Sequence, residues 1–445
     1  MLGRETALEI VHRALDMTRA DQVEVTLRGG DQALPRYAGS VIHQNVTERD
    51  TVLSIRAVIG KKVGFVESNA TDDEGIRRLA ERARAVAEAQ EENPDFVSLP
   101  SPTPLAAVDA WRESTARFTP EERARAVEKV VQVAGRYGAS ASGAFSTHTS
   151  ERAVVNSLGV EAYGSSTTAL LTAVMNKEPG GFGYADQVSR DAAAIDPEAV
   201  AEEAAETCAR GVSPRDLAPG VYPVILKPYA VADMVMFLGW MGLGALSVQE
   251  HRSFMNDRFG QRITGEAITL YDDGLDPAGL ATAFDPEGVA KQRVEMIVNG
   301  HANAVVYDSY TAHREGKQST GHASGGAGVW GPLPRNVFLA PGDADLDAMI
   351  ADTPRGILVT RFHYTNVLHP VKTVFTGMTR DGTFWIENGQ VAHPVKNLRF
   401  TQSILDALDT VSAIGRETKL QAEGGACRVP ALRLDAFEFS SATEF

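Results

Sequence analysis

Cysteine is scarce in this sequence. Its 445 residues include two cysteines, Cys208 and Cys427, which excludes a disulfide framework, and no C-x-x-C pair suggests a structural zinc site. No apolar run approaches the roughly 18 residues of a membrane span, and acidic residues stand where a signal peptide needs a basic and then an apolar segment. The sequence therefore predicts a cytoplasmic protein in a reducing compartment, with no membrane partner.

Basic residues are also in the minority. Lysine and arginine number 43 against 58 aspartates and glutamates, which gives a formal net charge of -15 at pH 7. No basic run forms a patch that would attract a polyanion, so nucleic acid is not an expected partner. In contrast, 43% of the residues are hydrophobic, and a chain of this length and composition is expected to fold into two or three domains.

The motifs of several enzyme classes are missing. The sequence has no H-E-x-x-H pair of zinc ligands, no G-x-S-x-G nucleophile motif and no P-loop. Glu250 and His251 are adjacent, and on a helix their side chains would point about 100° apart. Residues 326–331 spell G-x-G-x-x-G, but prolines follow where a helix should begin, so we interpret this match as chance.

The N-terminal part of the chain predicts helices that flank antiparallel strands. Apolar residues at helical spacing indicate a helix at residues 6–19, and Thr71 is expected to cap a second helix that ends near residue 91. Alternation of apolar and polar residues indicates strands between these two helices. The expected strands are residues 23–27, 41–46, 51–58 and 63–66, with a turn at residues 60–62 before the last of them.

A proline-rich stretch at residues 93–104 separates this part from a second part with a similar pattern. Gly64-Phe65 and Gly181-Phe182 each precede a helix, which suggests two hairpin-and-helix units, although chance similarity explains this echo equally well. The elements expected in the second part are a helix from Thr119 to near residue 138, strands within residues 139–186 and a helix at residues 197–210.

The C-terminal part of the chain is expected to be rich in strands. An apolar helix at residues 229–246 should be buried on nearly every face, and Asp381-Gly382 and Asn388-Gly389 are typical of hairpin turns. The sequence thus predicts an α+β fold, with N-terminal antiparallel hairpin-and-helix units and a mostly antiparallel β-rich C-terminal domain whose edges are protected. The expected domains are residues 1–100, 105–215 and 219–445.

Two places could carry chemistry. Residues 307–323 are dense in hydroxyl and charged side chains, which is typical of a binding loop, although a solvated loop explains this composition equally well. Cys427 follows glycines at residues 424–425, where a turn would leave the thiol approachable and able to pair with a histidine, although an inert, buried cysteine is the commoner outcome for such a residue. Cys208 lies on the helix expected at residues 197–210, and its side chain is expected to pack in the core.

Three stretches are distinctive when they are taken together. They are residues 271–274 (Tyr-Asp-Asp-Gly), 319–323 (Ser-Thr-Gly-His-Ala) and 382–389 with its continuation at 394–400. In these stretches the chain resembles the TldD/PmbA family, whose own loop reads S-T-G-N-A where this chain has His322 in place of asparagine. Members of this family are described as modulators of DNA gyrase and as peptidases that mature peptides.

The resemblance implies an α+β fold and a place for zinc. The catalytic TldD type carries an H-E-x-x-x-H motif on a helix that corresponds to residues 239–246 here, with a further cysteine ligand close to the position of Cys427. Every ligand of that helix and its general-base glutamate are missing, and one thiolate cannot hold a catalytic zinc that needs three protein ligands. The resemblance therefore implies a TldE/PmbA-type subunit with no cofactor or catalytic residue of its own, and zinc is expected in its partner.

The leading hypothesis is a heterodimer in which this chain pairs with a TldD-like zinc-binding subunit and shapes a channel for unfolded or extended peptides. One alternative is a self-sufficient peptidase that uses Cys427, or a metal held by Glu250, His251 and Cys427. The other alternative is a regulator of DNA gyrase. The residues expected to line the peptide channel are Tyr310, Thr311, Glu315, Ser319, Thr320, Gly321 and His322.

Overall fold

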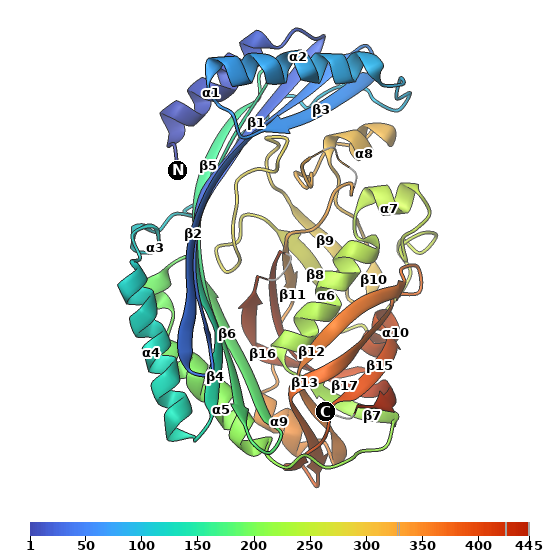
Figure 1. Cartoon of the computed structure of the whole chain (residues 1–445). Helices are drawn as coiled ribbons and strands as arrows, with labels where there is room; N and C mark the ends of the chain where they lie inside the picture. The colour runs from blue at the N-terminus through green and yellow to red at the C-terminus, as the bar shows by residue number, and fades with distance from the viewer. Residues whose placement is uncertain (327, 329, 423–424, 444–445) are drawn as a thin grey trace.

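The computed structural model describes residues 1–326, 328, 330–422 and 425–443, and Gly424 of the expected glycine turn lies outside them. These residues form a six-stranded sheet from the N-terminal part of the chain and an 11-stranded sheet from the C-terminal part. Figure 1 shows the N-terminal sheet as a long bent layer, with helices on its convex side and the C-terminal part on its concave side. The predicted α+β fold class is confirmed.

The N-terminal sheet is antiparallel throughout, in the order β3-β2-β1-β4-β5-β6. We predicted separate strands at residues 41–46 and 51–58, and this was wrong because β2 pairs with β1 along its whole length. The polar residues between those two stretches lie in an exposed part of one strand. The strands are β1 (Gln22–Ala38), β2 (Val41–Ile59), β3 (Lys62–Ser68), β4 (Ser140–Asn156), β5 (Glu161–Lys177) and β6 (Gly181–Ser189).

Two similar units build this sheet, each with a helix, three antiparallel strands and a second helix. The order of elements confirms the two hairpin-and-helix units that the sequence suggested. Gly64 and Gly183 allow the helix after each meander to pack closely: an added Cβ would lie 2.4 Å from the backbone nitrogen of Ala87 or 1.9 Å from the backbone oxygen of Ala204. The helices are α1 (Arg4–Met17), α2 (Asp73–Ala89), α3 (Glu113–Ala116), α4 (Pro120–Arg136) and α5 (Pro197–Arg210), with a 3-10 turn η1 (Ala192–Ala194) before α5.

Of the two N-cap residues that the sequence predicts, the structure confirms one. Thr119 caps α4 as expected, in a reciprocal pair with Glu122. Thr71 does not cap α2, because Asp72 takes that place and its carboxylate accepts the backbone N–H of Gly75 at 2.7 Å. The proline-rich stretch at residues 93–104 connects the two units, yet the strands on either side of it belong to one sheet because β1 pairs with β4.

The two faces of the N-terminal sheet differ in character. Val25, Leu27 and Ile55 belong to the apolar core that α1 and α2 cover. The alternate positions along the same strands carry Glu24, Arg28 and other polar side chains, because successive residues of a strand point to opposite faces. The concave face is therefore polar along β1 and β2, whereas Val154 and Val188 on β4 and β6 form apolar contacts with the C-terminal part.

The C-terminal sheet closes on itself. β17 pairs with β15 and also with β7, so β17, β15, β13, β12 and β7 form a ring. Most pairs are antiparallel, as predicted, while β7–β12 and β11–β17 are parallel. Closure removes the free edges of these strands. The strands are β7 (Gly220–Leu226), β8 (Leu270–Asp273), β9 (Arg293–Val298), β10 (His301–Ala302), β11 (Asn336–Leu339), β12 (Arg355–His369), β13 (Val374–Glu387), β14 (Gln390–Pro394), β15 (Leu398–Ser403), β16 (Val411–Gln421) and β17 (Ala426–Ala442).

Short helices complete the C-terminal part. The predicted apolar helix is mostly buried, as expected, but it ends at Gly242, and a second helix begins after Gly244. None of the helices in the described part of the chain has the length and apolar character needed to span a lipid bilayer. The cytoplasmic location stays a prediction. The helices are α6 (Pro228–Gly242), α7 (Ala245–Gln249), α8 (Ser309–Arg314), α9 (Leu346–Ala351) and α10 (Ile404–Asp409).

The two expected hairpin turns have different outcomes. Asn388 and Gly389 form the two-residue turn between β13 and β14, both with positive φ. Asp381 and Gly382 do not form a turn: they lie inside β13, where the pair stands opposite the single residue Thr360 of β12. The positive φ that suits such a pair to a turn also suits it to a β-bulge.

Candidate functional site

A cleft lies between the concave face of the N-terminal sheet and the loops of the C-terminal part. It consists of two adjoining cavities of about 680 and 380 Å³, which we call the larger and the smaller cavity of the central cleft. Arg28 and Arg152 line both cavities. Residues 281–284 close the larger cavity, and the start of α8 with residues 323–326 closes the smaller one. The cleft is large enough to hold several residues of an extended peptide.

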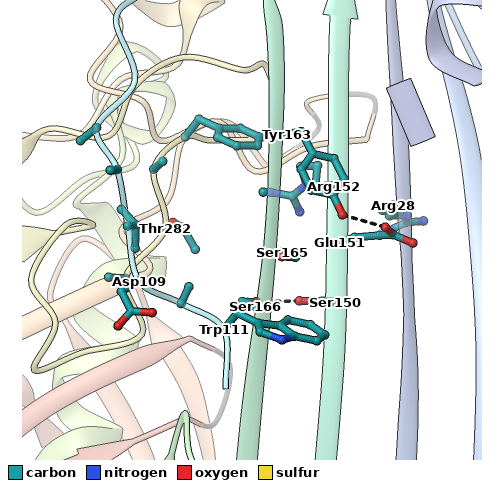
Figure 2. A pocket seen from close by; sticks show the side chains of 18 of the residues that line it. Arg28, Asp109, Trp111, Ser150, Glu151, Arg152, Tyr163, Ser165, Ser166 and Thr282 are labelled. Carbon is teal, nitrogen blue, oxygen red and sulfur yellow. Dashed lines mark hydrogen bonds between the residues drawn. The ribbon is translucent and has the colours of Figure 1, made fainter. Parts of the chain in front are cut away.

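The strand wall of the cleft carries two arginines side by side. Arg28 of β1 and Arg152 of β4 are direct cross-strand partners, so their side chains share the concave face. Figure 2 shows Arg152 on the side of the strands that faces Thr282. Hydroxyl groups of Ser150 and Ser166, which lie 2.8 Å apart, extend the polar wall.

A buried ion cluster joins this wall to the C-terminal part. Arg56 of β2 donates hydrogen bonds to Glu24 at 2.6 Å and to Glu287 at 3.0 Å, and these three side chains are 17%, 9% and 7% exposed. Burial raises the pKa of Glu24 although Arg56 opposes this shift. Burial alone would lower the pKa of Arg56, but the two glutamates raise it above its ordinary value. Glu287 also accepts the backbone N–H of Ser309 at 3.0 Å, so the cluster fixes the start of α8.

A second buried pair brings two of the distinctive sequence stretches together. His322 Nε2 lies 2.9 Å from Asp272 Oδ1, and both side chains are fully buried. The other carboxylate oxygen of Asp272 accepts the backbone N–H groups of Arg335 at 2.6 Å and Asn336 at 2.7 Å. Burial alone would raise the pKa of Asp272, but His322, the buried Lys291 and the backbone N–H of Asn336 lower it to about 2. Burial lowers the pKa of His322, so its imidazole is neutral at pH 7.

Replacing Asp272 by Asn should destabilise the protein by roughly 2 kcal/mol at pH 7. The carboxyl pKa is depressed on folding, so its contribution is present above pH 4 and is lost as the pH falls toward 2. The difference between wild type and variant should therefore shrink with acidification, which urea unfolding at several pH values would measure. Asp16→Asn, at an exposed position on α1, is the control and should have little effect at any pH. A loss of stability that does not change with pH would contradict this prediction.

The segment 307–323 is not a simple loop, because residues 309–314 form α8. Thr311 is fully buried and completes the cap of that helix: its hydroxyl donates to Asp308 at 2.6 Å. Tyr310 is partly buried, lines the smaller cavity and lies within hydrogen-bonding distance of Asn93. Glu315 is exposed and accepts from Gln249 at 2.8 Å. Of the channel residues expected in this helix, Tyr310 thus lines the cleft, next to Ser309 at the helix start.

The rest of the segment folds back on Tyr307. Ser319 and Thr320 both donate to the backbone oxygen of Tyr307, at 3.2 and 3.1 Å. Gly321 has φ +72°, and an added Cβ would lie 2.2 Å from the backbone oxygen of Ala290. Because Thr311, Gly321 and His322 are buried, the expectation that they line a peptide channel is corrected: they hold the loop in place.

The position implied for zinc ligands is tightly packed. An added Cβ at Gly244 would lie 2.1 Å from the backbone oxygen of Pro332, and one at Gly239 would lie 3.2 Å from the ring of Pro334. In the part of the chain that the structure describes, no three His, Cys, Asp or Glu side chains are placed to hold a metal ion together. The residues at this end of α6 therefore do not fit a catalytic zinc.

The cysteines and the alternative metal ligands are also accounted for. Cys427 is 1% exposed, and burial together with Asp233 raises the pKa of its thiol, so the structure agrees with the buried, inert cysteine and not with the approachable thiol. Glu250 is exposed and pairs with Arg252 at 2.6 Å, and His251 is exposed in a turn, so the structure does not bring Glu250, His251 and Cys427 together as a metal site. Cys208 is buried in α5, as predicted.

Sequence reasoning missed the arginines and carboxylates of the cleft. The apolar alternation of β1 was recognised, but its polar positions Glu24 and Arg28 were not interpreted as a second, facing surface. The signal was present in the alternation itself. The pairing of Asp272 with His322 had no such signal, because the two residues are 50 positions apart in the chain.

Comparison with known proteins identifies the family. Family models for PmbA/TldA metallopeptidases match domain 1 at residues 36–87, the central domain at residues 116–210 and the C-terminal domain at residues 219–441. The chain is 26% identical to the metalloprotease PmbA of Escherichia coli, over 96% of this chain and 94% of that protein. It is 22% identical to a metalloprotease TldD homologue of Haemophilus influenzae, over 87% and 84% of the two chains.

A solved structure has the same fold. TldE from Thermococcus kodakarensis superposes with a TM-score of 0.89 at 20% identity, over 97% of this chain and 99% of that one. The family models together cover most of the sequence, including the stretches at residues 271–274, 319–323 and 382–389. The chain therefore belongs to the TldD/PmbA family of metallopeptidases.

Proposed function

We propose that this chain is the metal-free, TldE/PmbA-type subunit of a metallopeptidase complex, in which a TldD-like partner holds the zinc. In this proposal the chain itself carries no cofactor, and its central cleft shapes the path of an unfolded or extended peptide toward the metal. Family membership supports a role in proteolysis, while the division of labour between two subunits is our inference.

The observation that carries the proposal is the packing at the end of α6. The resemblance implies zinc ligands on residues 239–246, and here glycines occupy that segment and contact Pro332 and Pro334. An added Cβ at Gly331 would lie 2.5 Å from Cβ of Leu246, so the proline loop and the helix end are fitted to each other and leave no room for a side chain at Gly244. A subunit that keeps the shared fold without the metal fits this packing.

Zinc content and peptide cleavage test the proposal. We expect the purified full-length chain to hold substoichiometric zinc and to leave unfolded casein intact, and both zinc and cleavage to appear when a TldD-like protein from the same source is added. Cys427→Ala should leave turnover by the mixture unchanged, because the thiol is buried and takes no part. A chain that alone holds one zinc ion and cleaves casein would refute the subunit role and support the self-sufficient peptidase.

A further inference from the structure

The arginines on the concave face differ in how they are neutralised. Arg56 is held between Glu24 and Glu287, and Arg28 lies 3.4 Å from Glu67. The Arg152 side chain is partly buried between the two cavities, and it forms no hydrogen bond or ion pair with any residue that the structure describes. Its guanidinium group therefore has all its donors available to the cleft.

The carboxylates near Arg152 are bound elsewhere. Glu151 is its neighbour in sequence, but this carboxylate accepts the backbone N–H groups of Leu2 and Gly3 and the hydroxyl of Tyr163. Figure 2 shows the contact between Glu151 and Tyr163.

Asp285 is the other acid close enough to influence Arg152. Its two oxygens accept the backbone N–H groups of Glu287, Val289 and Ala323 at 2.8 to 3.0 Å. Burial and the neighbouring Glu287 raise the pKa of Asp285 well above its ordinary value, which weakens its attraction for Arg152. Neither Glu151 nor Asp285 thus neutralises Arg152 by direct contact.

Positive charge around Arg152 increases the need for an anion. Burial lowers the pKa of Arg152, Asp285 opposes this shift, and Arg28 and Arg335 lower the pKa further. Arginine stays protonated at neutral pH despite such shifts. A partly buried guanidinium without a partner is unfavourable, whereas a carboxylate bound to its forked donors would be stabilised by charge-assisted hydrogen bonds.

We propose that Arg152, together with Arg28, forms a carboxylate-binding subsite in the larger cavity, and that it holds a carboxylate group of the peptide that enters the cleft. This inference rests on the proposed function, which supplies the peptide. The serine hydroxyls of β4 and β5 offer polar contacts to a peptide main chain, while Phe284 and Trp111 offer apolar surface for its side chains. A polyanion is disfavoured, because the chain as a whole carries a net charge of -15.

Peptide binding to the full-length chain tests this subsite. The probe is a fluorescein-labelled hexapeptide of alanine and serine with a free C-terminal carboxylate, and it is compared by fluorescence anisotropy with the same peptide as a C-terminal amide. We expect the acid to bind about tenfold more tightly than the amide. Arg152→Gln should remove this difference and leave amide binding unchanged, whereas Arg152→Lys should retain part of it, because lysine keeps the charge without the fork.

A third peptide identifies the source of the carboxylate. It is the amide with one internal aspartate: binding like the free acid means that the subsite accepts acidic side chains, and binding like the plain amide means that it selects the C-terminal carboxylate. Arg82→Gln on α2 is the matched control, since Arg82 is exposed and outside the cleft but its replacement changes the net charge equally.

Three results would overturn the subsite. They are equal binding of acid and amide, no binding of the free acid, and equal weakening of both peptides by Arg152→Gln. Arg152→Lys serves as the test variant if the glutamine variant does not fold. The zinc and cleavage measurements are independent of this experiment: a chain that cleaves alone would refute the subunit role and still leave the difference between acid and amide intact.

Discussion

Replacing Arg56 by Gln should lower the free energy of unfolding by about 3–5 kcal/mol, because it removes the cation between two buried carboxylates. Glu24 and Glu287 lie 2.6 and 3.0 Å from Arg56 and are 9% and 7% exposed. Without the guanidinium, the two carboxylates are left without a cation in a poorly solvated place. Urea unfolding at pH 7 measures the loss.

The pH dependence of this loss follows from the same cluster. The pKa of Glu24 is already raised by burial, and without Arg56 it should rise further. Protonation of Glu24 relieves its repulsion from Glu287, so the cost of Arg56→Gln should become smaller as the pH is lowered from 7 toward 5. The combination of Glu24→Gln with Arg56→Gln should recover part of the stability at pH 7.

Arg78→Gln is the control for this experiment. Arg78 pairs with Glu74 at 2.7 Å on the surface of α2, and both side chains are more than half exposed. Such a pair contributes only about 0.3–0.5 kcal/mol. Similar losses for Arg56→Gln and Arg78→Gln would show that the buried cluster does not join the sheet to the C-terminal part in the way we describe.

Replacing Phe400 by Ala should cost a similar amount, about 3–5 kcal/mol, through the cavity that it leaves in the C-terminal ring of strands. Phe400 on β15 is fully buried, and its ring centroid lies 4.5 Å from that of Phe362, 4.8 Å from that of Phe375 and 5.4 Å from that of Phe437. An added Cβ at Gly377 would lie 2.8 Å from the Phe400 ring, so the surroundings are already full.

Two further variants show how much of the loss comes from the buried cavity. Phe400→Leu should cost less than the alanine change, because leucine keeps part of the apolar volume. Phe259→Ala is the control, since the Phe259 side chain is 44% exposed and its removal leaves no buried cavity. Thermal or urea unfolding of the three variants should rank them in the order alanine, leucine and then control. Equal losses at positions 400 and 259 would contradict the role of Phe400 in the core.

Much of the fold could be predicted because local patterns determine it. The cap at Thr119, the apolar character of α6 and the Asn388-Gly389 turn each depend on a few neighbouring residues. The length of β2 could not be predicted, because its polar middle is held only by pairing with β1. The turn predicted at Asp381-Gly382 was wrong for a related reason. These two residue types favour positive φ angles, but whether they form a turn or a β-bulge depends on the partner strand.

The candidate site was less predictable than the fold. Arg28 and Arg152 are neighbours only because of the register between β1 and β4, and sequence periodicity does not give that register. The stretches at residues 271–274 and 319–323 were recognised through the family resemblance, but their contact through Asp272 and His322 required the folded chain. Burial also contradicts the expected channel-lining role of Thr311.

The ring closure of β7 with β17 has a consequence for the order in which the chain folds during synthesis. All strands of the N-terminal sheet come from residues 22–189, whereas β7 must wait for β17, about 200 residues later in the chain. Contacts between such distant segments form slowly, so the N-terminal sheet is complete while its concave face still lies in water. The charged and hydroxyl side chains of this face then keep the nascent chain soluble until the C-terminal ring of strands has folded and covers the face.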